Sequence, residues 1–241
     1  MDKGPLVSEI TFRSDMTVKL VQSMGADESV VFSARVSTGG SSPIDGLSEK
    51  DRGLINYLMR DRHGTPFEHN AFTFYVEAPI FVFREFMRHR IASYNEESGR
   101  YKELAPIFYV PDENRKLIQV GKPGAYTFED GSYDQKMLVP AELKRVTKEA
   151  YKSYQRMLEK GVAREVARAV LPVNIYSSMY VTMNARALMN FLSLRTMREG
   201  THFPSFPQRE IEMVAEQMEE LWAEKMPITY KTFNENGRVA P

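Results

Sequence analysis

The stretch over residues 88–100 constrains this chain more than any other, because it gathers charged and polar side chains directly after the apolar run over residues 79–87. Burying a charge without a partner costs free energy, so a sequence of this kind is unsuited to a hydrophobic core. Polar groups attached to a packed element are instead typical of a binding site. A solvated turn with internal Arg–Glu pairs is the alternative that composition leaves open.

Composition excludes several classes of function. The 32 basic and 32 acidic side chains give a formal net charge of zero, which argues against a general nucleic-acid binder but leaves a local basic patch open. The chain has no cysteine, so disulfides, thiolate metal sites and a cysteine nucleophile are excluded. No apolar signal core follows Met1, and no apolar run approaches the roughly 20 residues that span a bilayer. We therefore expect a cytoplasmic protein.

Hydrophobic periodicity predicts one α+β domain over residues 1–241, without an internal repeat or a linker. Alternating apolar and polar residues predict strands over 6–12, 18–21, 71–78, 106–110 and 175–183. Helical spacing and capping signals predict helices over 27–36, 48–62, 79–90, 141–160, 163–170, 184–194 and 208–226. Asp27 is expected to cap the first helix, and Ser48 with Asp51 to form the capping box of the second. Residues 112–138 are expected to form a surface excursion without a regular element.

Ser98, Gly99 and Arg100 form a suitable anion site. A hydroxyl and backbone N–H groups can point at one phosphate, glycine permits close approach, and the guanidinium adds a charge-assisted bond. Arg88 and Arg90 lie two positions apart, so on the helix expected there they point to different sides and can reach different ligands.

Asn95, Glu96 and His63 are further candidates for contact with a ligand. Asn95 and Glu96 can bond sugar hydroxyls or the edge of a heterocycle. His63 and His69 lie six positions apart, which is not the spacing of a zinc-binding helix. His63 lies in a Gly/Pro turn and is the better candidate for a ligand contact, whereas His69, just before a strand, fits a structural role.

Arg195 is expected at the end of the helix that begins after Asn184. A cation at a helix C-terminus is stabilised by the helix dipole by about 0.3–1 kcal/mol, which is a sufficient structural reason for its presence. Spacing alone does not give Asn184, Asn190 and Arg195 a shared function. No nucleophilic triad can be assembled from the sequence.

Residues 88–100 fill every fixed position of the pattern R-H-R-x-x-S-x-N-x-x-S-x-R. In this pattern the chain resembles the flavin-dependent thymidylate synthases. The resemblance continues in the segments 63–69, 164–172 and 184–195, and it covers roughly residues 27–110 and 141–226.

The resemblance implies reductive methylation of dUMP to dTMP, with methylenetetrahydrofolate as carbon donor, NADPH as reductant and FAD as bound cofactor. It implies a homotetramer whose active sites form at subunit interfaces, and a mixed domain with a mostly antiparallel sheet and long helices. The other type of thymidylate synthase attacks the uracil ring with a cysteine, which this chain does not have.

The resemblance also implies roles for individual residues. The side chains that would bind FAD are His63, Thr65, Arg88, His89, Arg90, Glu96, Asn184, Arg186 and Asn190. The residues that would bind dUMP are Glu85, Arg88, Glu96, Glu97, Ser98, Gly99, Arg100, Arg168 and Arg195. The implied catalytic residue is Arg195, a permanent cation that favours loss of the N3 proton of uracil. No metal is implied.

Three positions depart from the family pattern. Glu85 stands where relatives often have glutamine, and Glu97 where they often have leucine. Relatives place a histidine shortly after the arginine that matches Arg195, whereas residues 196–207 resemble an insertion that contains His202. Two rival interpretations remain: a non-catalytic module that binds nucleotides or RNA through residues 88–100, and an inactive relative.

Overall fold

The computed structural model describes residues 9–39 and 46–241, and these form two compact units. Within the described residues, the first unit consists of 9–15, 77–84 and 96–178, and the second of 16–39, 46–76, 85–95 and 179–241. The α+β class is confirmed. A single domain over residues 1–241 stays a prediction. The expected strand over 6–12 lies partly outside the described residues.

The largest sheet has four strands in the order β2-β3-β8-β4. Their bounds are β2 Thr17–Met24, β3 Ala71–Pro79, β8 Tyr176–Met183 and β4 Ser93–Glu96. In the second unit, the Thr73 hydroxyl meets that of Thr182, and the ring of Tyr75 meets that of Tyr180. Residue numbers rise along one strand as they fall along the other, so β3 and β8 are antiparallel. The predicted alternation along β3 is confirmed, because Phe72, Phe74 and Val76 are all buried.

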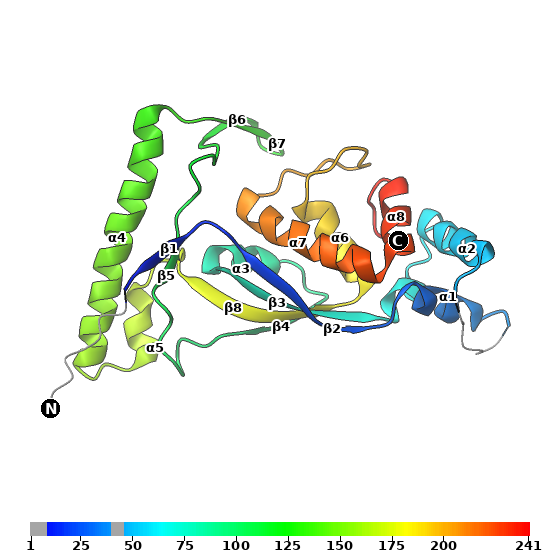
Figure 1. Cartoon of the computed structure of the whole chain (residues 1–241), viewed down its shortest axis with the longest axis horizontal. Helices are drawn as coiled ribbons and strands as arrows, with labels where there is room; N and C mark the ends of the chain where they lie inside the picture. The colour runs from blue at the N-terminus through cyan, green and yellow to red at the C-terminus, as the bar shows by residue number, and fades with distance from the viewer. Residues whose placement is uncertain (1–8, 40–45) are drawn as a thin grey trace. The chain divides into compact units, whose positions relative to one another are not determined.

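The first unit also contains two smaller sheets and a long helix. β1 (Thr11–Arg13) pairs in parallel with β5 (Ile107–Tyr109), and β6 (Ile118–Lys122) pairs antiparallel with β7 (Ala125–Glu129). Figure 1 shows the short α5 (Arg164–Ala167), which continues into η2 (Arg168–Val170), beside the long α4 (Tyr133–Glu159). Their contact forms part of a hydrophobic cluster made of Leu104, Phe108, Tyr151, Tyr154, Ala167 and Ile175.

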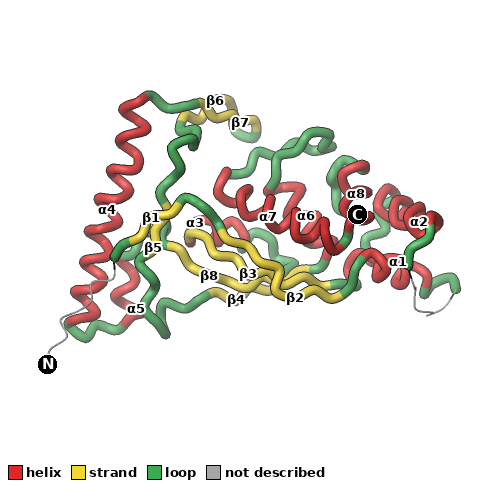
Figure 2. The backbone as a smooth tube through the Cα atoms, viewed as in Figure 1, coloured by secondary structure: helices red, strands yellow, loops and turns green. Residues whose placement is uncertain are grey.

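Residues 112–138 lie at the surface, as expected, but the expectation that they lack regular elements was wrong. They contain the β6–β7 hairpin and the first turns of α4, which leads away from that hairpin in Figure 2. The helix begins after Ser132, whose hydroxyl accepts from the backbone of Gln135 while the Gln135 side chain accepts from the Ser132 backbone. This capping box lies before Pro140, which is accommodated inside the helix.

The second unit is mostly helical. Its elements besides strands are α1 (Asp27–Arg35), α2 (Glu49–Arg60), η1 (Thr65–Glu68), α6 (Ala185–Arg195), α7 (Arg209–Lys225) and α8 (Pro227–Glu235). The predicted box of Ser48 and Asp51 is confirmed, as is the cap at Asn184, whose side chain accepts from the backbone of Ala187. The helix over 227–235 was not predicted.

Asp27 does not cap α1, whose N-cap is Ala26. Its buried carboxylate accepts instead from the backbone N–H groups of Ile228 and Thr229 at 2.9 and 2.8 Å. Asp27 therefore caps α8, an element about 200 residues away in sequence.

The helix expected over 79–90 is shorter: α3 spans Ile80–Phe86. The Tyr94 hydroxyl donates to the backbone oxygens of Phe86 and His89 at 2.9 and 2.7 Å. The Phe86 oxygen, which would accept from the Arg90 backbone if the helix continued, accepts instead from the His89 N–H at 2.8 Å and from this hydroxyl. Arg88–Arg90 consequently lie beyond the helix rather than on it.

In the part of the chain that the structure describes, no helix is long and apolar enough to cross a membrane.

Candidate functional site

The side chain of Arg195 is held between an acid and a histidine in the second unit. Nη1 of Arg195 donates to Oε2 of Glu85 over 2.6 Å, and Nε donates to Nε2 of His89 over 3.1 Å. Arg195 is the last residue of α6, and Glu85 lies in the last turn of α3. Both side chains are mostly buried, with exposed fractions of 18% and 23%. The predicted catalytic residue is therefore oriented by two other predicted site residues.

Burial and the nearby cation determine the charge of His89. Loss of solvent, followed by repulsion from Arg195, lowers the pKa of His89 from 6.5 to about 4. The imidazole is therefore neutral at physiological pH, and its Nε2 can accept from the guanidinium. The Phe191 ring packs against the imidazole with its centroid 4.9 Å away, and Phe86 stacks on Phe191 at 4.8 Å.

The two carboxylate oxygens of Glu85 differ: Oε2 accepts from Arg195, whereas Oε1 accepts from no described residue. Burial raises its pKa, with a smaller raising effect from Glu210, whereas Arg195 lowers it. Oε1 of Glu85 is buried and has no hydrogen-bond donor among residues 9–39 and 46–241. A buried acceptor without a donor costs free energy, so this oxygen is suited to receive a donor from a bound molecule.

Arg88 and Arg90 are both exposed, and within the described residues neither has a carboxylate partner. Their backbone is fixed by the Tyr94 hydroxyl, whose pKa is raised to about 12 by burial, so it stays protonated and donates. The turn therefore presents two cations free to bind an anion.

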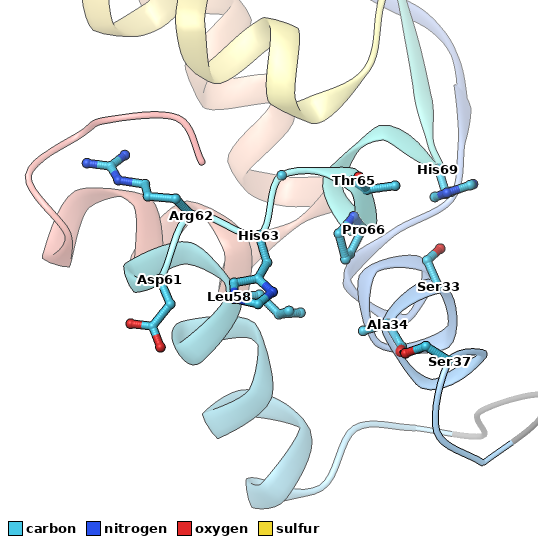
Figure 3. Close-up of a pocket in the computed structure, with 11 residues that line it drawn as sticks. Ser33, Ala34, Ser37, Leu58, Asp61, Arg62, His63, Thr65, Pro66 and His69 are labelled. Atoms are coloured by element: carbon cyan, nitrogen blue, oxygen red, sulfur yellow. The ribbon is translucent and has the colours of Figure 1, made fainter.

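A pocket of about 520 Å3 contains two of the predicted cofactor residues, His63 and Thr65. Figure 3 shows Ser33 and Ala34 on α1 and Ser37 just beyond it, with His63 in the segment that links α2 to η1 and Thr65 at the start of η1. The pocket is lined by Ser33, Ala34, Ser37, Leu58, Asp61, Arg62, His63, Gly64, Thr65, Pro66 and His69. Hydroxyls, imidazoles and a guanidinium in one cavity favour a polar or anionic ligand.

Three further predicted cofactor residues lie on α6 or at its N-cap. Asn184 caps the helix, Asn190 donates to the backbone oxygen of Arg186 at 3.2 Å, and Arg186 forms a 2.6 Å ion pair with Glu68 of η1. Gly64 makes the approach of Arg186 possible, because a Cβ at this glycine would lie 2.5 Å from Nε of Arg186.

The residues predicted to bind the nucleotide, apart from Glu85, Arg88 and Arg195, lie in the first unit. Gly99 is buried, and a Cβ there would come within 3.3 Å of Cδ of Arg168. Glycine thus allows close packing of the chain on Arg168. Arg100 pairs with Glu165 through an exposed contact of 2.9 Å, and its backbone N–H donates to the Ser98 hydroxyl at 3.3 Å.

Two adjacent carboxylates differ in their partners. Glu97 accepts from the Ser178 hydroxyl at 3.1 Å and pairs with Lys102 at 2.7 Å. The pKa of Glu96 is raised chiefly by partial desolvation, although the residue is exposed overall; the Ser177 hydroxyl and Arg168 oppose this rise, and Glu97 adds to it. Glu97 is thus engaged within the protein, whereas Glu96 is the better candidate for a ligand contact.

The described residues contain no group of three or more acidic or histidine side chains that could hold a metal ion.

A family model described as thymidylate synthase complementing protein matches residues 19–228. The chain belongs to this family. Its resemblance to flavin-dependent thymidylate synthases is confirmed by the flavin-dependent thymidylate synthase of Streptomyces coelicolor, which is 61% identical over 237 residues, covering 97% of this chain and 96% of the relative. The enzyme of the same name from Tropheryma whipplei strain TW08/27 is 59% identical, covering 98% of this chain and 99% of the relative.

A solved structure of a relative shows the same fold. The UMP/dUMP methylase PolB from Streptomyces cacaoi, bound with 5-Br dUMP, has a TM-score of 0.90 and 56% sequence identity. The similarity covers 96% of this chain and 100% of that chain.

For this member of the thymidylate synthase complementing protein family, sequence reasoning missed part of the pocket around His63. Ser33 lies on α1 and Ser37 in the turn that follows it, so helical spacing does not link these two hydroxyls. Arg62 and Asp61 gave no signal either, because they lie at the end of α2, where an exposed charged pair is ordinary. His69, interpreted as structural, also lines the pocket.

Proposed function

We propose that this protein methylates dUMP to dTMP reductively, with methylenetetrahydrofolate as carbon donor, NADPH as reductant and FAD as cofactor. Membership of the thymidylate synthase complementing protein family supports this proposal, as do the names of the relatives. The observation that carries it is the position of Arg195, a mostly buried permanent cation held by Glu85 and by a neutral His89.

The residues of the second unit fit a flavin nucleotide. The pocket around His63 and Thr65 offers hydroxyls and Arg62 for a pyrophosphate or ribose. Arg88 and Arg90 add exposed cations without carboxylate partners among the described residues. When bound, FAD would supply the hydride chemistry that no side chain of the protein can perform.

The residues of the first unit fit a nucleoside monophosphate. Ser98 and Arg100 offer a hydroxyl and a guanidinium to the phosphate, and Arg168 adds a second cation beside Gly99. The contact of Arg100 with Glu165 is exposed, so an incoming phosphate can replace the carboxylate at small cost.

Arg195 supplies the electrostatic activation. Its guanidinium stays charged at every physiological pH, so it can stabilise the negative charge that develops on uracil when N3 loses a proton. Because His89 is neutral and accepts from Nε of Arg195, it does not compete for that charge. Glu85 fixes the guanidinium at two atoms, because its carboxylate accepts from Nη1 at 2.6 Å and its backbone oxygen accepts from Nη2 at 3.4 Å.

We also propose that the protein acts as a homotetramer with active sites at subunit interfaces. The division of the predicted residues supports this proposal, because those assigned to phosphate binding lie in one compact unit and those assigned to the flavin, apart from Glu96, lie in the other.

Anaerobic incubation of the protein with dUMP, methylenetetrahydrofolate, NADPH and FAD tests the reaction, with dTMP measured by chromatography. We expect dTMP only when all four are present, and a yellow protein after removal of free flavin. An Arg195→Ala variant should keep its flavin and lose most turnover. A protein that binds no FAD, or an Arg195→Ala variant with near-normal dTMP formation, would contradict the proposal.

A further inference from the structure

A buried ion pair contacts Thr196, the residue that directly follows Arg195. Nη1 of Arg238 donates to Oε1 of Glu219 over 2.6 Å, and Nη2 donates to Oγ1 of Thr196 over 2.9 Å. Arg238 and Glu219 are each 3% exposed, and Thr196 is completely buried. Since Thr196 directly follows Arg195, the side chain of Arg238 is attached to the backbone that carries the proposed catalytic guanidinium.

The backbone around Arg238 is held in an unusual conformation. Arg238 has a φ of +57° and follows Gly237 at +71°, so two successive residues are left-handed. This conformation is unfavourable for arginine and persists where the surroundings fix it. The Arg238 N–H donates to the oxygen of Phe233 at 2.9 Å, and the oxygen of Gly237 accepts from the His202 N–H at 2.9 Å.

The segment after Arg195 is fixed from several sides. The Thr196 hydroxyl donates to the oxygen of Leu192 at 2.7 Å, and the Thr196 oxygen accepts from the hydroxyl of Ser205 at 2.6 Å. The second oxygen of Glu219 accepts from Arg198 at 3.0 Å. Glu219 of α7 therefore binds both Arg198 and Arg238, and these contacts anchor the end of α6 to α7.

The ion pair is a poor source of stability. Desolvation of two charges offsets most of their attraction, so buried pairs can often be replaced by apolar side chains without loss. Nε of Arg238 is also buried, and no acceptor for it exists among the described residues. The benefit of this arrangement is the defined geometry of the chain at Thr196.

We propose that Arg238 is a positioning residue for Arg195, acting through Thr196; its importance for turnover rests on the proposed function. A displacement of about 1 Å at a reacting group can reduce turnover roughly 100-fold, so an anchor immediately after Arg195 matters to the reaction. Loss of the anchor lets the end of α6 relax and the guanidinium leave Glu85 and His89.

The test removes the hydrogen bond between Arg238 and Thr196 by changing Thr196, the smaller of the two residues. Thr196→Val keeps the shape of the side chain but removes the acceptor for Arg238. Thr196→Ala, which leaves room for a water molecule, is the second variant in case the first does not fold. Thr229→Val is the matched control, because Thr229 is also completely buried in the second unit and its hydroxyl contacts a charged group, Asp27, at 2.6 Å.

The first readout is the titration of His89, followed by 13C NMR of labelled histidine. The chain has four histidines, and His89→Gln identifies the signal. Among the described residues, the charged side chain in contact with His89 is that of Arg195, which also binds Glu85, while Phe191 and Tyr94 are uncharged. We expect a pKa of about 4 in the parent and in Thr229→Val, and a higher pKa in Thr196→Val and Thr196→Ala.

The second readout is turnover at a temperature at which every variant is folded. We expect kcat to fall about 10- to 100-fold in the Thr196 variants, and to stay within about twofold of the parent in Thr229→Val. Thr196 variants with the parent titration and the parent kcat would overturn the proposal, as would equal losses of kcat in Thr229→Val. If the parent forms no dTMP, the proposed function fails, while the titration of His89 still decides whether Thr196 positions Arg195.

Discussion

The guanidinium of Arg195 and the carboxylate of Glu85 form a 2.6 Å ion pair although they lie 110 residues apart in sequence. Each comes from the end of a helix, where the chain leaves a rigid element. The pair therefore fixes the catalytic candidate without placing it on a flexible loop.

For turnover, we expect the hydrogen bond that Glu85 accepts from Arg195 to matter more than the negative charge of Glu85. Glu85→Gln keeps an oxygen for Nη1 of Arg195, so we expect less than about tenfold loss of dTMP formation. Glu85→Ala removes the acceptor, and a loss of about 100-fold or more is expected, comparable to removing a preorganised electrostatic contact. Steady-state kinetics with flavin content checked by absorbance measures both variants, and equal activities in the two would contradict this role.

His89 should make the fold sensitive to acid. Its pKa is lowered from 6.5 to about 4, so its contribution to stability is complete above pH 6.5 and is lost as the pH falls toward 4. Between pH 7 and pH 5, we expect the free energy of unfolding to fall by about 2 kcal/mol more in the parent than in His89→Gln. Urea denaturation at the two pH values measures this difference, and parallel pH profiles would disprove it.

Gly64 should matter because of the space it leaves for Arg186. A Cβ there would come 2.5 Å from Nε of Arg186 and 2.8 Å from the oxygen of Pro241. We expect Gly64→Ala to lower stability by about 1–3 kcal/mol and to weaken flavin binding. Gly53→Ala is the control, because Gly53 lies within α2 with nothing near a new Cβ, and it should stabilise by about 0.5–1 kcal/mol. Thermal denaturation and flavin titration measure both variants.

Gly99 and Arg168 should affect the nucleotide and not the flavin. Arg168→Lys keeps the charge but loses the planar fork, and Gly99→Ala pushes Cδ of Arg168 from a distance of 3.3 Å. We expect a roughly tenfold or greater rise in the KM for dUMP in each variant, since one charge-assisted contact is worth about 1.5–3 kcal/mol. Flavin affinity should be unchanged, and a loss of flavin from either protein would place these residues elsewhere.

Active sites shared between subunits can be detected by complementation. Arg195→Ala and Arg168→Ala should each be almost inactive alone. If one site takes Arg195 and Arg168 from different subunits, co-expression with random assembly restores about a quarter of the sites. Turnover of the co-purified mixture, compared with a mixture of separately purified proteins, measures this recovery. No recovery after co-expression would place both residues in one subunit.

Local signals predicted much of the fold. The capping box of Ser48 and Asp51, the cap at Asn184 and the alternation along β3 depend on neighbouring residues, and all three are confirmed. The β6–β7 hairpin also carried a local signal, the Pro123-Gly124 turn between alternating apolar residues, but the polar composition around it concealed the pattern.

Features that depend on distant contacts could not be predicted from the sequence. The end of α3 depends on the hydroxyl of Tyr94, and the role of Asp27 depends on α8. For the candidate site, the pattern over residues 88–100 indicated which residues to consider. It could not indicate that Glu85 and His89 hold Arg195, because that contact arises only when α3 and α6 pack together.

The interleaving of the two units limits how this protein can be dissected. The segment 96–178 contains the candidate phosphate residues, yet as an isolated fragment it would lack β1, the partner of β5, and Ile80, which packs on its hydrophobic cluster. The second unit is likewise assembled from separate parts of the chain. Neither ligand-binding function can therefore be obtained by truncation or transferred as one contiguous module, and variants have to be made within the whole chain.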